Sequence, residues 1–482
     1  MRTYPLALVA LLGCKGSGPP PAPAGSEADA LWAMAPPDTT SGLVVTSRAL
    51  RLADGAIAAG RALLAGDDIA LMRAMIDVQI TKRFGAPIAS LADVGIDTSR
   101  GIALFESPSG PLWIVQVADR AKLHRAFELG DDRGGERLGE LTCATVRERY
   151  ACARDLAQVR AAATRSTAVP PEIVKLGVRG DIELHERRPN RGALVAQIEP
   201  GAMIIHGEIQ APPRVLAVLG APRPRAERAG LTGFMAADLA TLSGGWRERL
   251  EAAVQANLDA VAGPMTMTAV AGAAVPDVHL PLKDATPARQ WVEACVLPAE
   301  LLADVQPEGT CRIDARQVGV AIDVWVEGDT LRAGRKSPLP TTAPVPLTSL
   351  GEELARGSWS FVTWGRGTIL AGAEPSSNTG LLGLLALISE LGIGLRVDRD
   401  VVSFVLGART VWANPDEVAV PLVEIVRDLV RGEADPERAD ALAKTHPTSP
   451  FALDHQAGRG GLLLAEAGAA VLGFTLGQVR DD

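Results

Sequence analysis

Short apolar runs of strand length alternate with segments of helical periodicity along this 482-residue chain. Residues 42–46 form a β-branched run, and leucines at helical spacing follow it. Residues 101–105 and 112–117 indicate a hairpin across Ser-Pro-Ser-Gly, after which Asp119 starts another helix. The pattern predicts an α+β fold with mostly antiparallel sheets and packed helices.

The second half repeats this outline faintly. Residues 232–236 take the place of the first strand, residues 245–262 have an apolar helical face, and 265–270 with 278–282 resemble the earlier hairpin. Asp284 then starts a helix, as Asp119 does. The identity between the halves is too low to establish a duplication, so two similar halves and two unrelated domains both stay open.

The last third adds a strand with alternating side chains at 358–364. Further elements are expected there: an apolar helix near 380–391, strands at 393–398 and 401–411, a helix at 415–430 and a buried terminal helix at 461–479. The length fits two α+β domains, 29–225 and 226–482, the second with C-terminal helices.

Composition narrows the function classes. Hydrophobic residues make up 47% of the chain, enough for a packed core, and the net charge of -9 argues against a nucleic-acid surface. We find no metalloprotease, serine-hydrolase, phosphate-loop or dinucleotide motif, and no cofactor is indicated. Asp454-His455 precedes a glycine-rich turn, but no nucleophile accompanies it, so a surface loop is the simpler interpretation.

Three predicted strands, 180–186, 193–199 and 202–210, alternate polar and apolar residues. If they are antiparallel neighbours, their polar faces join into one patch that could hold a divalent cation. The alternative, which we favour, is an ordinary solvated face of a sheet. The candidate ligands are Glu183, His185, His206 and Glu208.

Four cysteines form two local pairs, Cys143 with Cys152 and Cys295 with Cys311. Neither pair has the spacing of a zinc site, so disulfides are expected, which persist in the periplasm. Three pairings of four cysteines are possible, and the sequence does not choose among them.

The N-terminal residues have the features of a targeting segment. One Arg, an apolar run from Leu6 to Leu12 and Gly13 precede Cys14, and the apolar run is too short to span a membrane. Leu11-Leu12-Gly13-Cys14 resembles the lipobox of bacterial lipoproteins. The resemblance implies a signal peptide at 1–13 and a lipidated Cys14, followed by a proline- and glycine-rich tether over 14–28. Lys15 after the cysteine favours the outer membrane over the inner one.

The rest of the chain loosely resembles uncharacterised exported lipoproteins of Gram-negative bacteria. The resemblance lies only in the pattern of strands and helices, so it implies no active-site residues. The sequence therefore favours a non-enzymatic binding or scaffold protein, held in the envelope by acyl chains on Cys14, facing the periplasm or the cell surface. Its expected partner is an envelope protein or a small apolar or peptide ligand, not nucleic acid. The alternative is a periplasmic hydrolase or metal-dependent enzyme that uses the strand patch.

Overall fold

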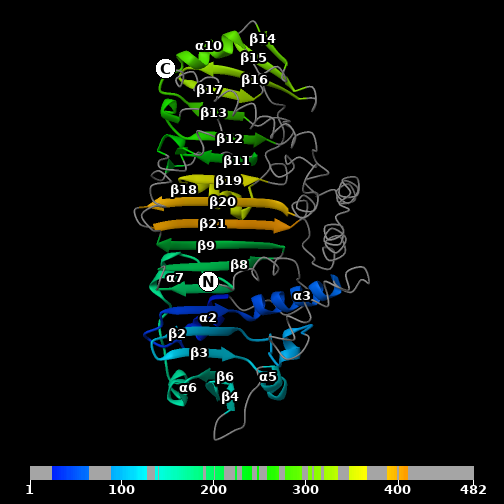
Figure 1. Cartoon of the computed structure of the whole chain (residues 1–482), viewed down its shortest axis with the longest axis vertical. Helices are drawn as coiled ribbons and strands as arrows, with labels where there is room; N and C mark the ends of the chain where they lie inside the picture. The colour runs from blue at the N-terminus through cyan, green and yellow to red at the C-terminus, as the bar shows by residue number, and fades with distance from the viewer. Residues whose placement is uncertain are drawn as a thin grey trace. The chain divides into compact units, whose positions relative to one another are not determined.

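The helices and strands of the computed structural model are labelled in Figure 1. The described residues belong to two compact units. Described residues up to Gln210 belong to the first unit, and those from 223 to 410 to the second. The structure describes residues 24–63, 88–126, 136–138, 140–187, 191–199, 201–210, 223–224, 231–241, 247–248, 258–270, 277–295, 302–306, 309–315, 320–334, 347–365, 388–398 and 401–410.

The first unit is built on one antiparallel sheet. Its central strand β1 pairs with β2 on one side and β7 on the other. Within this unit the strand order is β4-β5-β6-β3-β2-β1-β7-β8-β9. The strands are β1 (Ser41–Val45), β2 (Ile102–Ser107), β3 (Gly110–Val115), β4 (Glu136–Leu138), β5 (Leu141–Val146), β6 (Arg149–Ala153), β7 (Ile182–Glu186), β8 (Gly192–Glu199) and β9 (Ala202–Gln210).

Helices cover the two faces of this sheet unequally. On one face, α2 (Ala24–Trp32), α6 (Leu156–Ala162) and α7 (Pro171–Lys175) enclose the main core of the unit, and we call this the helix-covered face. On the opposite face, α3 (Ser47–Leu63) packs over one end of β7–β9, while α5 (Arg120–Ala126) packs over β5 and β6. A short 3-10 helix, η3 (Leu91–Val94), precedes β2.

The second unit has a corresponding sheet with central strand β11. Within this unit the strand order is β14-β15-β16-β17-β13-β12-β11-β19-β20-β21. A separate two-stranded ladder joins β10 (Arg223–Pro224) to β18 (Ser358–Trp359). The sheet strands are β11 (Leu231–Ala237), β12 (Met265–Val270), β13 (Asp277–Pro281), β14 (Leu302–Gln306), β15 (Thr310–Ala315), β16 (Val320–Glu327), β17 (Thr330–Gly334), β19 (Phe361–Gly365), β20 (Ile388–Asp398) and β21 (Val401–Thr410).

Two helices pack on opposite faces of the second sheet. On one face α10 (Thr286–Ala294) places Trp291 and Val292 in a core with residues of β15 and β16. The 3-10 helices η4 (Leu239–Thr241) and η5 (Leu258–Ala260) lie between β11 and β12 in the chain. On the other face, α11 (Ser349–Arg356) packs on glycine residues of the sheet. A Cβ added at one of them, Gly407, would lie only 2.4 Å from the Leu350 side chain. The glycines thus let this helix approach the sheet closely.

The two units share one strand order. In each, the first strand is central, a hairpin follows it on one side, and the last three strands form a meander on the other. Even the isolated bridges correspond, because Ile96 pairs with Val117 around the first hairpin and Val261 with Leu282 around the second. The second unit has one additional strand at its β14 edge.

The predicted α+β class is wrong. Strand accounts for 48% and helix for 26% of the described structure, so each unit is a large antiparallel sheet with few helices. The main reason lies in residues 302–334, where four strands follow one another without a helix between them. Most of the helix expected near 380–391 lies outside the described residues, and its last residues are strand instead, because β20 begins at Ile388.

Several expected elements fall outside the described residues. They are the signal peptide, Cys14, most of the tether, most of the helix over 245–262, the helix at 415–430 and the terminal segment 461–479. The described end of the predicted tether, residues 24–28, is not a linker, because it forms the start of α2.

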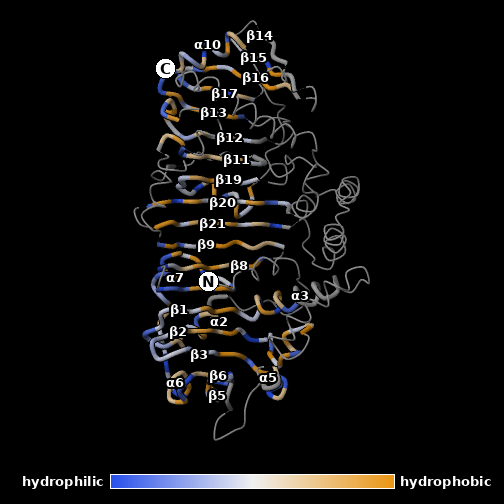
Figure 2. Tube along the Cα trace, in the orientation of Figure 1, coloured by the Kyte–Doolittle hydropathy of each residue, from blue (hydrophilic) through white to orange (hydrophobic). Residues whose placement is uncertain are grey.

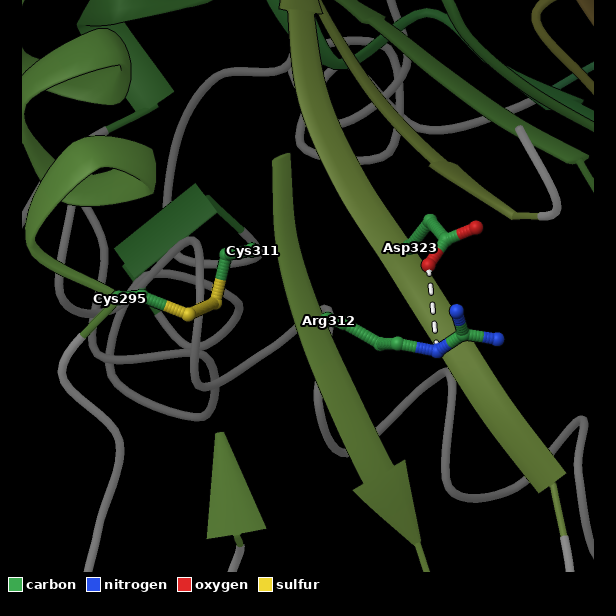
Figure 3. The surroundings of a disulfide bond; sticks show 4 residues. All are labelled: Cys295, Cys311, Arg312 and Asp323. Atoms are coloured by element: carbon green, nitrogen blue, oxygen red, sulfur yellow. Dashed lines mark ion pairs between the residues drawn. A yellow bond between two sulfur atoms is a disulfide. The ribbon is translucent and has the colours of Figure 1, made fainter. Parts of the chain in front are cut away.

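Both cysteine pairs are disulfides. Cys143 and Cys152 are opposite each other on β5 and β6, with Cα atoms 4.0 Å apart. Cys295, directly after α10, is bonded to Cys311 on β15 (Figure 3). Beside Cys311 on β15, Arg312 Nε lies 3.8 Å from Oδ1 of Asp323, a buried residue of β16. Of the three possible pairings, the structure shows the local one.

Candidate binding surface

The predicted polar patch exists as a geometric arrangement. Strands β7, β8 and β9 are antiparallel neighbours, as the prediction required. Their register aligns Glu183 with Val195 and His206 in one row. The next row aligns His185 with Ala193 and Glu208. All four candidate ligands therefore lie on one face of the sheet.

This face is not solvated, so that interpretation was wrong. Glu183 is 0% exposed, His185 1% and His206 6%, because they lie on the helix-covered face. The indole of Trp32, at the end of α2, lies edge-on to the His185 ring, with centroids 6.4 Å apart. Residues of α2 and α7 belong to the same apolar cluster as Val195. The alternation correctly predicted which residues share the polar face, but it did not predict that this face is buried.

Glu183 is the most completely bonded of the four. Its carboxylate accepts hydrogen bonds from Trp32 Nε1 at 2.8 Å and from Gly180 N at 3.2 Å. The Arg179 guanidinium donates two more, from Nε at 2.7 Å and from Nη2 at 3.0 Å. Such a buried charge is tolerable only when paired and hydrogen-bonded, as it is here.

The remaining polar groups connect α7 to the sheet. His185 Nε2 lies 3.2 Å from Glu172 Oε2, and Arg191 Nη2 donates to Glu172 Oε1 at 3.0 Å. At the end of α7, Lys175 Nζ donates to Glu208 at 2.6 Å. Each carboxylate of this face is thus engaged by a cationic or imidazole side chain. Over the described ranges no group of three His, Cys, Asp or Glu is placed to hold a metal ion.

Burial shifts the titration of this network. Desolvation lowers the pKa of His185, opposed by the attraction of Glu172, and desolvation also lowers the pKa of His206. For Glu172, desolvation acts to raise the pKa, but the hydrogen bonds and charges around it lower the pKa overall. Both imidazoles are therefore neutral in the folded protein at neutral pH.

We expect the first unit to lose stability as the pH falls below about 6.5, the ordinary histidine pKa. In that range the histidines of the unfolded chain bind protons, whereas the buried imidazoles of the folded chain stay neutral because their pKa is lower. Protonation therefore favours unfolding. Urea unfolding at pH 7.5 and 5.0 measures the difference. The variant His185→Gln with His206→Gln should lose most of this pH dependence, and an unchanged dependence would contradict the assignment.

The second unit holds a buried carboxylate that sequence reasoning missed. Glu390, 2% exposed, accepts a hydrogen bond from Trp364 Nε1 at 2.6 Å and from the Thr348 hydroxyl. Arg409 Nε donates to its other oxygen at 3.2 Å. A carboxylate bonded by an indole and a guanidinium thus occurs in both units. Glu390 was missed because its segment was read as an apolar helix.

The opposite face of the first sheet carries a half-exposed apolar row. Direct register partners across five strands bring together residues far apart in the chain. Figure 2 shows hydrophobic and hydrophilic residues interspersed along the strands of this sheet. Trp113 is 37% exposed, and the other members are half-buried. This set, the leucine row, consists of Trp113, Leu104, Leu43, Leu184 and Leu194.

The second unit has an equivalent row. It runs from β13 to β20, the five strands that correspond to those of the leucine row, and continues by one more strand onto β21. Leu406 at its end is 36% exposed, and the other members are half-buried. This methionine row consists of Val278, Met267, Met235, Thr363, Ile393 and Leu406.

Contiguous apolar patches on a protein surface mark sites of interaction when they are large. Here they occur twice, at equivalent places on two sheets. The strand alternation around residues 182–186 and 358–364 could have indicated apolar faces, but only the register shows that they line up.

Comparisons with known protein families, with curated proteins and with solved structures found no match to this chain. Among the helices that the structure describes, none is long and apolar enough to cross a membrane.

Proposed function

We propose that this chain is a lipid-anchored, non-enzymatic protein of the cell envelope that binds apolar ligands on its leucine and methionine rows. The observation that carries the proposal is the repetition of a half-exposed apolar row on equivalent strands of both units. A face needed only for stability would be covered by helices, as the opposite face of the first unit is. Burying apolar area is the main favourable contribution to such binding.

The anchor is the part of this proposal that rests on the N-terminal sequence. Leu11-Leu12-Gly13-Cys14 supports lipidation of Cys14 after export. The two disulfides support an oxidising compartment, because disulfides are rare in a reducing cytosol. The short tether would then hold an apolar binding surface near a bilayer.

The experiment has one arm for the anchor and one for the rows. Cells expressing the full chain are labelled with a palmitate analogue, and label should appear in the wild type and be absent from Cys14→Ser. The purified full-length Cys14→Ser chain is then titrated with the neutral dye N-phenyl-1-naphthylamine. We expect saturable binding, weakened about tenfold by Trp113→Ser combined with Leu406→Ser.

Val174 provides the matched control. It is 59% exposed on α7 and belongs to neither row. Val174→Ser removes comparable exposed apolar surface and should leave dye binding unchanged. Equal dye binding by the double variant and the wild type would reject the rows as the binding surface, and an unlabelled wild-type chain would reject the anchor.

A further inference from the structure

In the first unit an acidic row lies directly beside the leucine row. Glu106 and Glu186 are both register partners of Ser41, on β2 and β7 respectively. Each follows a member of the leucine row by two residues, Leu104 and Leu184, so its side chain points to the same face. The acidic row consists of Pro111, Glu106, Ser41, Glu186 and Gly192.

The two carboxylates differ from the other acids of this sheet. On the helix-covered face Glu183 and Glu208 each bond a basic side chain, and Glu172 bonds another at α7. Glu106 is exposed and Glu186 half-buried, and neither side chain forms an ion pair with another residue in the described ranges. Two carboxylates beside an apolar row make an amphipathic surface with negative charge along one edge.

In the described strands of the second unit, the corresponding row carries no carboxylate. Gly233 occupies the position that Ser41 has in the first unit, and its partner across β19 is Gly365. The next residue in that row is Leu391. The rows are therefore alike in apolar character but different in charge, and this difference predicts different ligands for the two units.

We propose that the first unit binds an amphipathic segment of a partner protein, with apolar side chains on the leucine row and lysines or arginines on Glu106 and Glu186. This inference rests on the proposed function and names the ligand class of one of its two surfaces. Charge complementarity of this kind gives specificity and speeds association. The acidic edge also disfavours an anionic lipid headgroup at the same place.

The spacing fits a helical segment. Neighbouring strands lie about 4.8 Å apart, so the leucine row extends about 19 Å across its five strands. The two glutamates stand two strands apart, about 10 Å, which matches residues i and i+7 of an α-helix at 1.5 Å per residue. A helix of about 15 residues can contact both rows if it has leucines on one face and two flanking lysines seven residues apart. The leucines then lie on the leucine row and the lysines on the two glutamates.

The test compares two synthetic peptides of this design, one with lysines and one with glutamates at the flanking positions. Fluorescence anisotropy measures the affinity of each labelled peptide for the full-length Cys14→Ser chain at low and at high salt. We expect the lysine peptide to bind at least about tenfold more tightly, with an affinity that falls as salt rises. Glu106→Gln with Glu186→Gln should remove most of this preference.

The matched control removes the same charge elsewhere. Glu140 and Glu148 are exposed in turns beside β5, and Glu140→Gln with Glu148→Gln should leave the preference for the lysine peptide intact. Equal affinity for the two peptides, or equal effects of the two double variants, would overturn the inference. Binding to vesicles of phosphatidylglycerol but not to the lysine peptide would likewise overturn it in favour of a lipid surface.

Dye binding separates this inference from the proposed function. Glu106→Gln with Glu186→Gln keeps every apolar side chain, so it should still bind the neutral dye. If dye binding depends on Trp113 and Leu406 while the peptides are not distinguished, the proposed function stands and the inference fails. If dye binding does not depend on the rows, the proposed function is rejected, and the inference that rests on it is rejected with it.

Discussion

Replacing Glu183 by alanine should lower the free energy of unfolding of the first unit by about 3 to 5 kcal/mol. The carboxylate is 0% exposed and accepts hydrogen bonds from Trp32, Arg179 and Gly180. Its removal leaves the buried Trp32 indole N–H without its acceptor. The Arg179 guanidinium, 28% exposed, loses two hydrogen bonds and keeps only its pair with Asp29. Removing one partner of a buried ion pair costs more than the pair itself contributes, because the groups left behind stay partly desolvated.

Urea unfolding followed by tryptophan fluorescence measures this effect, since Trp32 lies at the site. Glu183→Gln keeps an acceptor oxygen and should lose less stability than Glu183→Ala. Glu148→Ala removes a carboxylate that is 79% exposed and should change stability by less than about 0.5 kcal/mol. A loss as small for Glu183→Ala as for Glu148→Ala would show that the buried network does not stabilise the unit.

Removing the disulfide between Cys295 and Cys311 should destabilise the second unit by about 3 kcal/mol. The two cysteines are 16 residues apart, and the bridge restricts the unfolded chain accordingly. In the folded state it fixes the end of α10 to β15, where Cys311 is 0% exposed in the core. The double variant Cys295→Ser with Cys311→Ser avoids leaving a free thiol.

The other disulfide serves as the comparison. Cys143→Ser with Cys152→Ser removes a bridge between neighbouring strands with a separation of 9, and the smaller loop predicts a loss of about 2.5 kcal/mol. Chemical unfolding with one probe for each unit should show each variant lowering only the transition of its own unit. Equal shifts in both transitions would mean that the units do not unfold independently.

Local elements were largely predictable from the sequence. The two hairpins, the meander at 182–210 and the helix starts fit the structure because turn residues and caps act over a few residues. Asp119 accepts a hydrogen bond from Lys122 N, and Asp284 accepts one from Thr286 N, as helix-initiating aspartates do. The strands over 302–334 were missed, and with them the β-rich class.

The candidate site was predictable only in part. Alternation correctly placed Glu183, His185, His206 and Glu208 on one face of three neighbouring strands. It gave no sign of Trp32, which reaches Glu183 from α2, or of the leucine row, whose members come from five strands. Such groupings depend on register between distant segments, which no local pattern encodes.

By itself the sequence determined where strands turn, which helices begin at an aspartate, and which residues of each strand share a face. Only the tertiary structure decided which of the two faces the helices cover. Period-two alternation assigns side chains to two faces of a sheet, but it does not say which face other elements cover. In the first unit α2 and α7 pack on the face with the charged residues and bury them. The leucines, bordered by two glutamates, therefore lie on the other face.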